Sequence, residues 1–292
     1  DAVRTATDDP KAYALALAKL RNDLVSPRMV LLRQFNGLEY GVKFLVDMRA
    51  DLRRLVREHP ELASLDAELK YLLSGWFDAG FLELRRITWG APADLLEKLI
   101  AYEAVHEIQS WTDLKNRLES DRRFYAFFHP AMHDEPLIFV EVALVKGIAD
   151  SVQTLLDETQ PIADPEDADT AIFYSISNAQ PGLSGVSFGD FLIKQVVDHL
   201  SHELPNIKTF ATLSPIPGFR RWLNKKLADG AELLDHTQAD ALEAVAGDRP
   251  HGADALPWLL DRPEWHQDPG IAEALKPVLM HLVAGYLLYQ RR

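Results

Sequence analysis

Apolar residues in the first part of the chain recur every three or four positions, which is the spacing of a helix with one buried face. Residues 42–58 carry Phe44, Leu45, Met48, Leu52 and Leu55 at this spacing. Residues 11–25 are rich in alanine and leucine, and residues 62–74 continue the trend. Pro27 and Pro60 interrupt the pattern. We therefore predict a bundle of about four helices over residues 1–88, a span that includes the segment FDAGFLELRRI.

The pattern changes after residue 88. Short runs rich in Phe, Ile and Val predict strands at residues 123–130, 136–145, 170–177 and 207–214. Helices are expected at residues 92–106, 111–119 and 191–204, and through most of the chain from residue 219. Because strands and helices alternate, this half is mixed α/β or α+β. The predicted organisation is a helical domain at residues 1–88 and a mixed domain at residues 89–292.

Composition narrows the classes of function. The 292 residues are 47% hydrophobic and 26% charged, as in a soluble globular protein. A net charge of −13 opposes binding to nucleic acid or to an anionic membrane, and no apolar run reaches the roughly 18 residues of a membrane span. The absence of cysteine excludes disulfides, thiolate metal sites and cysteine nucleophiles. The first residues lack the apolar core of a secretory signal, so we expect a cytoplasmic protein without nucleic-acid or membrane partners.

The segment from residue 170 to residue 214 carries two candidates for chemistry. Its loop places Gly182, Gly185 and Gly189 just before the helix at 191–204, an arrangement that can hold an anion such as pyrophosphate. The loop matches neither the Walker pattern nor G-x-G-x-x-G, and such a loop is more often only a connection. Ser214 ends the last strand in the frame Ser-Pro-Ile-Pro-Gly. A turn that closes a strand is the simpler interpretation, and a hydroxyl held for chemistry is the alternative.

A basic cluster follows the serine. The segment GFRRWLNKKL carries Arg220, Arg221, Lys225 and Lys226, a local reversal of sign in an acidic chain. It is either a solvated helix face or a binding surface for a polyanionic ligand. The histidine pairs 129/133 and 199/202 lack an H-E-x-x-H pattern and a third ligand, so we expect no metal site. Taken together, the loop, the serine and the basic helix indicate a nucleotide-like acyl carrier as ligand.

The segments FYSISNAQPGLSGVSFGDFLIK and FATLSPIPGFRRWL resemble the malonyl-CoA decarboxylase family, and the likeness covers nearly all of residues 75–290. The resemblance implies an α+β chain, with an N-terminal helical bundle followed by a catalytic domain similar to the GNAT acetyltransferases. It implies decarboxylation of malonyl-CoA to acetyl-CoA and CO2 in fatty acid metabolism. The resemblance also implies that no cofactor takes part, because the thioester itself accepts the electron pair.

The resemblance also assigns site residues. Ser214 corresponds to the family's catalytic serine, and the malonyl-CoA loop comprises Ser184, Gly185, Val186, Ser187, Phe188, Gly189 and Asp190. Some members have a glutamate where this loop has Ser187, so no acidic role is transferred to that position. Family members also carry a catalytic histidine in a segment like FHLxNGA. No such segment occurs here, so no histidine receives this role and we expect the 292-residue chain alone to be an incomplete catalyst.

Two other functions remain open at this point. One is a GNAT-type acyltransferase that moves an acyl group from CoA to an amine, and the other is a non-catalytic acyl-CoA-binding protein. The helical region at residues 1–88 is expected to serve as a surface for homo-oligomer assembly, because helices with wide apolar faces pack on one another.

Overall fold

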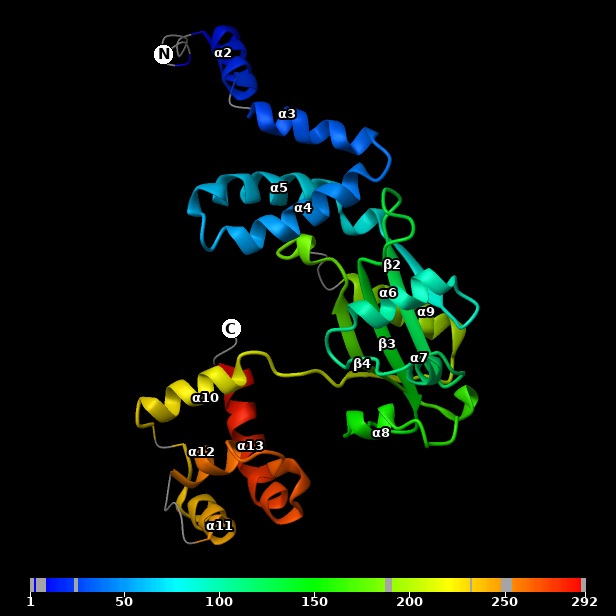
Figure 1. The fold of residues 1–292 in the computed structure, drawn as a ribbon, viewed down its shortest axis with the longest axis vertical. Coiled ribbons are helices and arrows are strands. Elements are labelled where there is room, and N and C mark those ends of the chain that lie inside the picture. Colours follow the sequence, from blue (N-terminus) through cyan, green and yellow to red (C-terminus); the bar gives the residue numbers. More distant parts are fainter. Residues whose placement is uncertain are drawn as a thin grey trace. The chain divides into compact units, whose positions relative to one another are not determined.

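The computed structural model describes residues 3, 9–23, 26–186, 191–231, 233–247 and 254–289. The chain divides into two compact units, Asp1–Ser214 and Pro215–Arg292. Each unit has a hydrophobic core of its own. Figure 1 shows that the first unit contains both the N-terminal helices and the β-sheet, whereas the second is helical. The predicted α+β class is confirmed, and the predicted boundary at residue 88 stays a prediction.

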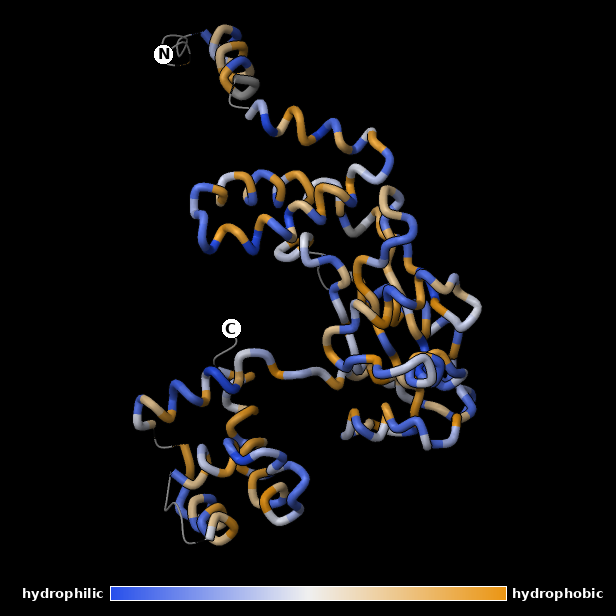
Figure 2. The backbone as a smooth tube through the Cα atoms, in the orientation of Figure 1, coloured by the Kyte–Doolittle hydropathy of each residue, from blue (hydrophilic) through white to orange (hydrophobic). Residues whose placement is uncertain are grey.

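The N-terminal helices of the first unit follow the predicted periodicity. They are α2 (Pro10–Asp23), α3 (Pro27–Gln34), α4 (Gly41–Leu55) and α5 (Ala63–Trp76). The predicted buried face of α4 is partly wrong, because Phe44 and Leu55 are exposed while Leu45 and Leu52 are buried. The buried face instead includes Val42 and Arg49, a residue that a hydrophobic pattern assigns to solvent. Figure 2 shows the apolar and polar residues alternating along these helices.

The sheet has five strands in the order β1-β2-β3-β4-β5. Their bounds are β1 (Glu83–Ile87), β2 (Arg122–Phe128), β3 (Ile138–Val145), β4 (Thr170–Asn178) and β5 (Thr209–Thr212). The first four strands pair antiparallel, and β5 pairs parallel to β4. The predicted strands correspond to β2–β5. The predicted helical character of residues 83–87 was wrong: they form an edge strand, because this segment takes its conformation from pairing with β2.

Helices cover both faces of this sheet. On one face, α9 (Phe191–Glu203) buries Leu192, Val196 and Leu200 in a core that includes Val140 and Phe173. On the other face, α6 (Ala93–Tyr102) and α7 (Trp111–Arg117) contribute Leu99 and Leu114 to a core that includes Phe124 and Phe139. A short helix, α8 (Val152–Leu156), lies between β3 and β4 in sequence. The central strands are therefore buried on both sides.

The second unit is built from α10 (Phe219–Ala228), α11 (His236–Ala246), α12 (Ala255–Leu260) and α13 (Pro269–Tyr289), which confirms the predicted helical character of this part. Leu223, Leu242 and Leu259 are fully buried in its core. Among the described residues, α13 is long and apolar enough to cross a membrane on length and composition alone, which is weak evidence for a span. Leu275 and Val278 of this helix lie in the core of the unit.

Candidate active site at the open edge of strand β4

Strand β5 pairs with only the first part of β4. The parallel register runs from Thr170 opposite Thr209 to Phe173 opposite Thr212. One further hydrogen bond joins the Leu213 amide to the Phe173 carbonyl at 2.9 Å. The prolines that follow in the sequence donate no ladder hydrogen bond, so the pairing ends here. Residues 174–178 of β4 thus continue without β5 at their side, and no strand of the described residues pairs with them there, so we call this stretch the open edge of β4.

Ser214 lies where this pairing stops. It is exposed, and it comes directly after the last residue bonded to β4. Continuing the register places Ser214 level with Ser175 of β4. The glycine-bearing loop starts beyond Asn178, roughly 10 Å farther along the strand at about 3.3 Å per residue. Both candidates therefore lie on the open edge of β4, at different heights along the strand.

The loop predicted to bind malonyl-CoA is described in its first part. A short 3-10 turn at Pro181–Leu183 leads to Ser184, Gly185 and Val186. Gly185 has a φ of +76°, a left-handed conformation that favours glycine. Ser187, Phe188, Gly189 and Asp190 lie outside the described residues, so their predicted role stays a prediction.

Two small cavities adjoin the described part of the loop. One has a volume of about 180 Å³ and is lined by Gln180, Ser184 and Gly185 among others. The other, of about 230 Å³, lies between the ends of β3 and β4 and the start of α9. Asn178 and Val186 line both cavities. Three residues of the predicted loop are thus at the wall of a cavity next to the open edge.

Beneath the open part of β4 lies a buried ionic network that sequence reasoning missed. Glu141 of β3 is fully buried, and Arg117 of α7 donates to it at 3.2 Å. Arg117 also pairs with Asp113 at 2.7 Å. Glu103 accepts hydrogen bonds from the hydroxyls of Ser175 and Ser177 of β4, at 2.8 and 3.0 Å. The sequence feature that could have indicated this network is Glu141, the single glutamate inside the apolar run PLIFVEVALV.

The charges of this network are strongly perturbed. Burial raises the pKa of Glu141 to about 8, against the opposing effect of Arg117 and with a further rise from Glu103. Burial and the nearby Glu141 raise the pKa of Tyr174 well above its ordinary value. Glu141 and Tyr174 belong to β3 and β4, and the other members of the network are also buried, so the open edge rests on a polar layer that is largely shielded from water.

A β-bulge explains why the serines of β4 face this network. Val142 pairs with Phe173 and Glu141 pairs with Ser175, so Tyr174 is an extra residue in β4. Before the bulge, Phe173 belongs to the core on the α9 side. After it, Ser175 and Ser177 face Glu103.

Three other candidates from the sequence, Arg220, His129 and His199, make ordinary structural contacts. Arg220 in the basic helix forms an ion pair with Asp261, within the second unit. His129 packs on the ring of Phe77, and burial lowers its pKa. His199 lies 3.7 Å from Glu203. Among the described residues no group of three or more His, Cys, Asp or Glu side chains could hold a metal ion.

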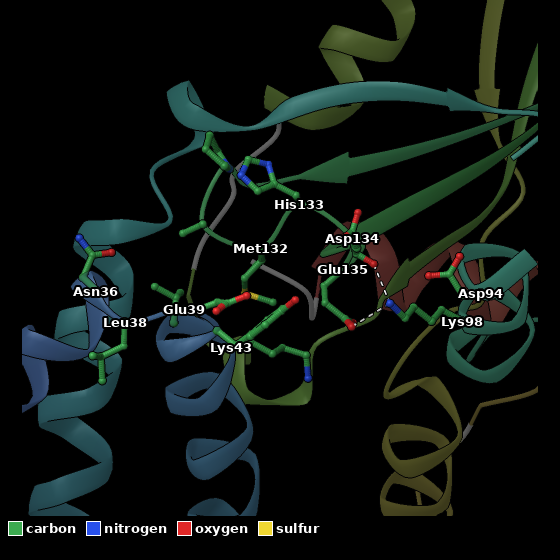
Figure 3. A pocket seen from close by; sticks show the side chains of 14 residues that line it. Asn36, Leu38, Glu39, Lys43, Asp94, Lys98, Met132, His133, Asp134 and Glu135 are labelled. Carbon is green, nitrogen blue, oxygen red and sulfur yellow. Dashed lines mark hydrogen bonds and ion pairs between the residues drawn. The ribbon is translucent and has the colours of Figure 1, made fainter. Parts of the chain in front are cut away.

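A larger cavity lies elsewhere in the first unit, and both lysines among its described lining residues are paired with carboxylates. It has a volume of about 530 Å³ and lies where the start of α4 meets the β2–β3 connection (Figure 3). Of its two lysines, Lys98 contacts Glu135 at 3.0 Å and Lys43 contacts Asp47 at 2.6 Å. The cavity also exposes Asp94, so its charge opposes an anionic CoA ester.

Comparison with known proteins identifies the family. Residues 1–77 match the model of the malonyl-CoA decarboxylase N-terminal domain, and residues 80–292 match that of the malonyl-CoA decarboxylase C-terminal domain. A mitochondrial malonyl-CoA decarboxylase of Rattus norvegicus is 39% identical over 283 residues, covering 92% of this chain and 57% of that protein. One of Anser anser anser is 40% identical over 276 residues, covering 90% of this chain and 54% of that protein. The chain therefore spans just over half the length of these curated relatives.

Solved structures agree with this result. A malonyl-CoA decarboxylase from Rhodopseudomonas palustris is 43% identical, with a TM-score of 0.86 over 100% of this chain and 67% of that one. A malonyl-CoA decarboxylase from Agrobacterium vitis is 42% identical, with a TM-score of 0.79 over 98% of this chain and 65% of that one. With both family models matched along its length, the chain belongs to the malonyl-CoA decarboxylase family.

Proposed function

We propose that the protein containing this chain converts malonyl-CoA to acetyl-CoA and CO2. The observation that carries the proposal is the match to both family models over residues 1–77 and 80–292. The site supports it, because the glycine-bearing loop before α9 and the exposed Ser214 both adjoin the open edge of β4. The loop's position before α9 suits the anionic phosphates of a CoA ester.

We further propose that the sheet of the first unit is GNAT-like. Four antiparallel strands followed by a parallel fifth strand that leaves β4 after Phe173 support this assignment. In this arrangement the CoA ester would lie along residues 174–178 of β4, between the loop and Ser214. The acyl end would then reach the serine, and the phosphates would reach the loop.

The chemistry requires a stabilised enolate and a proton. The bond between the carboxylate carbon and the α-carbon breaks, CO2 leaves, and the electron pair moves into the thioester to form an enolate. Proton uptake at the α-carbon then gives acetyl-CoA, so the reaction consumes one proton and needs no redox partner. Ser214 would donate a hydrogen bond to the thioester oxygen as negative charge develops there. The thioester serves as electron sink, so we propose that no organic cofactor or metal takes part.

The proposal is tested on the whole protein that contains this chain, by measuring acetyl-CoA and CO2 formed from malonyl-CoA. Ser214→Ala should lower kcat by at least about 100-fold, since removing one oxyanion donor commonly costs that much. Ser201→Ala is the matched control, because Ser201 is an exposed serine of α9 whose one hydrogen bond within the described part of the chain goes to its own helix, at the Val197 carbonyl. Equal activity of Ser214→Ala and the parent would exclude the role of Ser214.

The same assay separates the other two functions. Transfer of the acyl group to an amine without release of CO2 would identify an acyltransferase. Binding of malonyl-CoA in a calorimeter without turnover would identify a binding protein. The family match supports neither of these alternatives.

We also propose that the helical region mediates homo-oligomer assembly. Large apolar side chains stand exposed on its helices, among them Val30, Leu31 and Phe44. Exposed apolar surface of this kind favours association with another apolar surface. Light scattering of the whole protein should give a multiple of the monomer mass, and a mass equal to one chain would refute the proposal.

A further inference from the structure

The turn Pro181–Leu183, which leads into the malonyl-CoA loop, rests directly on helix α4. Gly182 lies so close to this helix that a Cβ atom on it would be 1.8 Å from the carbonyl oxygen of Val46. No side chain fits in that space, so the backbone of the loop and the backbone of the helix are in contact. Helix α4 therefore supports the backbone of this segment directly.

Two arginines of α4 donate hydrogen bonds to carbonyl groups of this turn and of the first loop residue, Ser184. Arg49 donates from Nη1 to the Gly182 carbonyl at 2.5 Å and to the Ser184 carbonyl at 3.0 Å. Arg53, one turn farther along the helix, donates to the Pro181 carbonyl at 3.0 Å. Residues four apart share one helix face, so both guanidinium groups reach the same loop.

Arg49 is buried in a way that makes these hydrogen bonds hard to replace. Its side chain is 2% exposed, and its Nε bonds to Asp66 of α5 at 2.9 Å. A buried guanidinium needs several acceptors to offset the loss of its hydration. Asp66 and the two loop carbonyls supply them, so the position of the loop and the position of the arginine depend on each other.

The hydrogen bond to the Ser184 carbonyl also sets the direction of an amide. In a planar trans peptide the carbonyl and the following N–H point in opposite directions. Because the Ser184 carbonyl points to Arg49, the N–H of Gly185 points away from the helix. Within the described part of the chain, this N–H donates to no protein acceptor. Ser184 and Gly185 both line the cavity of about 180 Å³ beside the open edge of β4.

We propose that Arg49 is a positioning residue for malonyl-CoA: it fixes the Ser184–Gly185 peptide so that the Gly185 N–H is presented to the substrate. The inference rests on the proposed function and goes beyond it, because it assigns a role in substrate binding to a helix that precedes the sheet in the sequence. Asp66 keeps the guanidinium of Arg49 in place. Arg53 supports the start of the same loop.

The test compares variants of the whole protein by steady-state kinetics and by calorimetric binding of acetyl-CoA. Arg49→Lys keeps the charge but loses the planar fork that bonds two carbonyls and Asp66. We expect the KM for malonyl-CoA and the Kd for acetyl-CoA to rise about tenfold, with kcat within about twofold of the parent. Arg54→Lys is the matched control, because this exposed arginine of the same helix pairs with Asp51 and, among the described residues, contacts no part of the loop.

A second variant tests the proposal even if Arg49→Lys does not fold. Arg53 is exposed, so Arg53→Met should fold and should raise the KM about threefold while leaving kcat nearly unchanged. A folded Arg49→Lys protein with the KM and Kd of the parent overturns the proposal. If Arg49→Lys does not fold, an unchanged KM in Arg53→Met overturns it.

Failure of the proposed decarboxylase function would give a different result from failure of the proposed role of Arg49. A parent protein that binds acetyl-CoA but releases no CO2 from malonyl-CoA refutes the decarboxylase assignment, and the binding series then decides the role of Arg49. A parent protein that does not bind acetyl-CoA refutes both.

Discussion

The buried carboxyl group of Glu141 should make the folded state less stable as pH rises. Burial raises the pKa of Glu141 from 4.5 to about 8. Arg117 at 3.2 Å opposes this rise, but its guanidinium is shared with Asp113. In the unfolded chain the carboxyl loses its proton above pH 4.5, whereas in the folded chain it keeps the proton to about pH 8. The unfolded state binds fewer protons in this window, so the free energy of unfolding falls as pH increases.

Glu141→Gln removes this titration at nearly constant size. With pKa values of 4.5 and about 8, the linkage relation predicts a difference between pH 5.5 and pH 8.5. Over this range the parent should lose about 3 kcal/mol more unfolding free energy than the variant. The measurement is urea unfolding of both proteins, followed by circular dichroism at the two pH values. The unfolding free energy of Glu141→Gln relative to that of the parent should therefore be higher at pH 8.5 than at pH 5.5.

The control is Glu97→Gln, which changes an exposed glutamate of α6 and should reproduce the pH dependence of the parent. If the parent and Glu141→Gln lost the same free energy between the two pH values, the raised pKa of Glu141 would be refuted. A variant that is less stable than the parent by the same amount at both pH values would show a packing defect and no titration.

Three further substitutions test other parts of the structure. Gly182→Ala should raise the KM for malonyl-CoA at least about tenfold, since its Cβ would lie 1.8 Å from the Val46 carbonyl and displace the loop; an unchanged KM contradicts that contact. Leu200→Ala should lower the free energy of unfolding by about 2–5 kcal/mol in a urea titration, because this side chain is fully buried under the sheet. Ser110→Ala should cost about 1 kcal/mol by the same method, because its hydroxyl caps α7 at the Asp113 amide; no loss would contradict the cap.

The sequence was informative where local pattern decides the structure. The apolar runs that became β2–β5 and the periodic segment that became α9 were predicted because their own residues favour those conformations. Ser214 could also be placed at a strand end from its prolines alone. Its proposed catalytic role, by contrast, came only from the family resemblance, and the structure by itself assigns no chemistry to it.

Features that depend on distant partners could not be predicted. Strand β1 is short and charged, and it is a strand because it pairs with β2 nearly forty residues later, at registers such as Arg86 with Tyr125. Arg49 reads as a solvent-facing residue of an amphipathic helix, yet its acceptors lie at residues 182 and 184. Glu141 is a lone charge in an apolar strand by sequence, and its partners Arg117 and Glu103 are known only from the structure. In each case the decisive neighbour is far away in the sequence.

The bulge at Tyr174 means that β4 consists of two half-strands whose side chains alternate in opposite phase. A regular strand of the same sequence, without the bulge, would turn the later half over, with Ser175 and Ser177 on the apolar α9 side and Ile176 toward Glu103. Loss of Tyr174 together with the bulge would not do so, because Phe173 and Ser175 already lie opposite Val142 and Glu141, which are neighbours on β3. Relatives that lack a residue at this position should therefore pair the strand regularly and still present both serines to the buried glutamate.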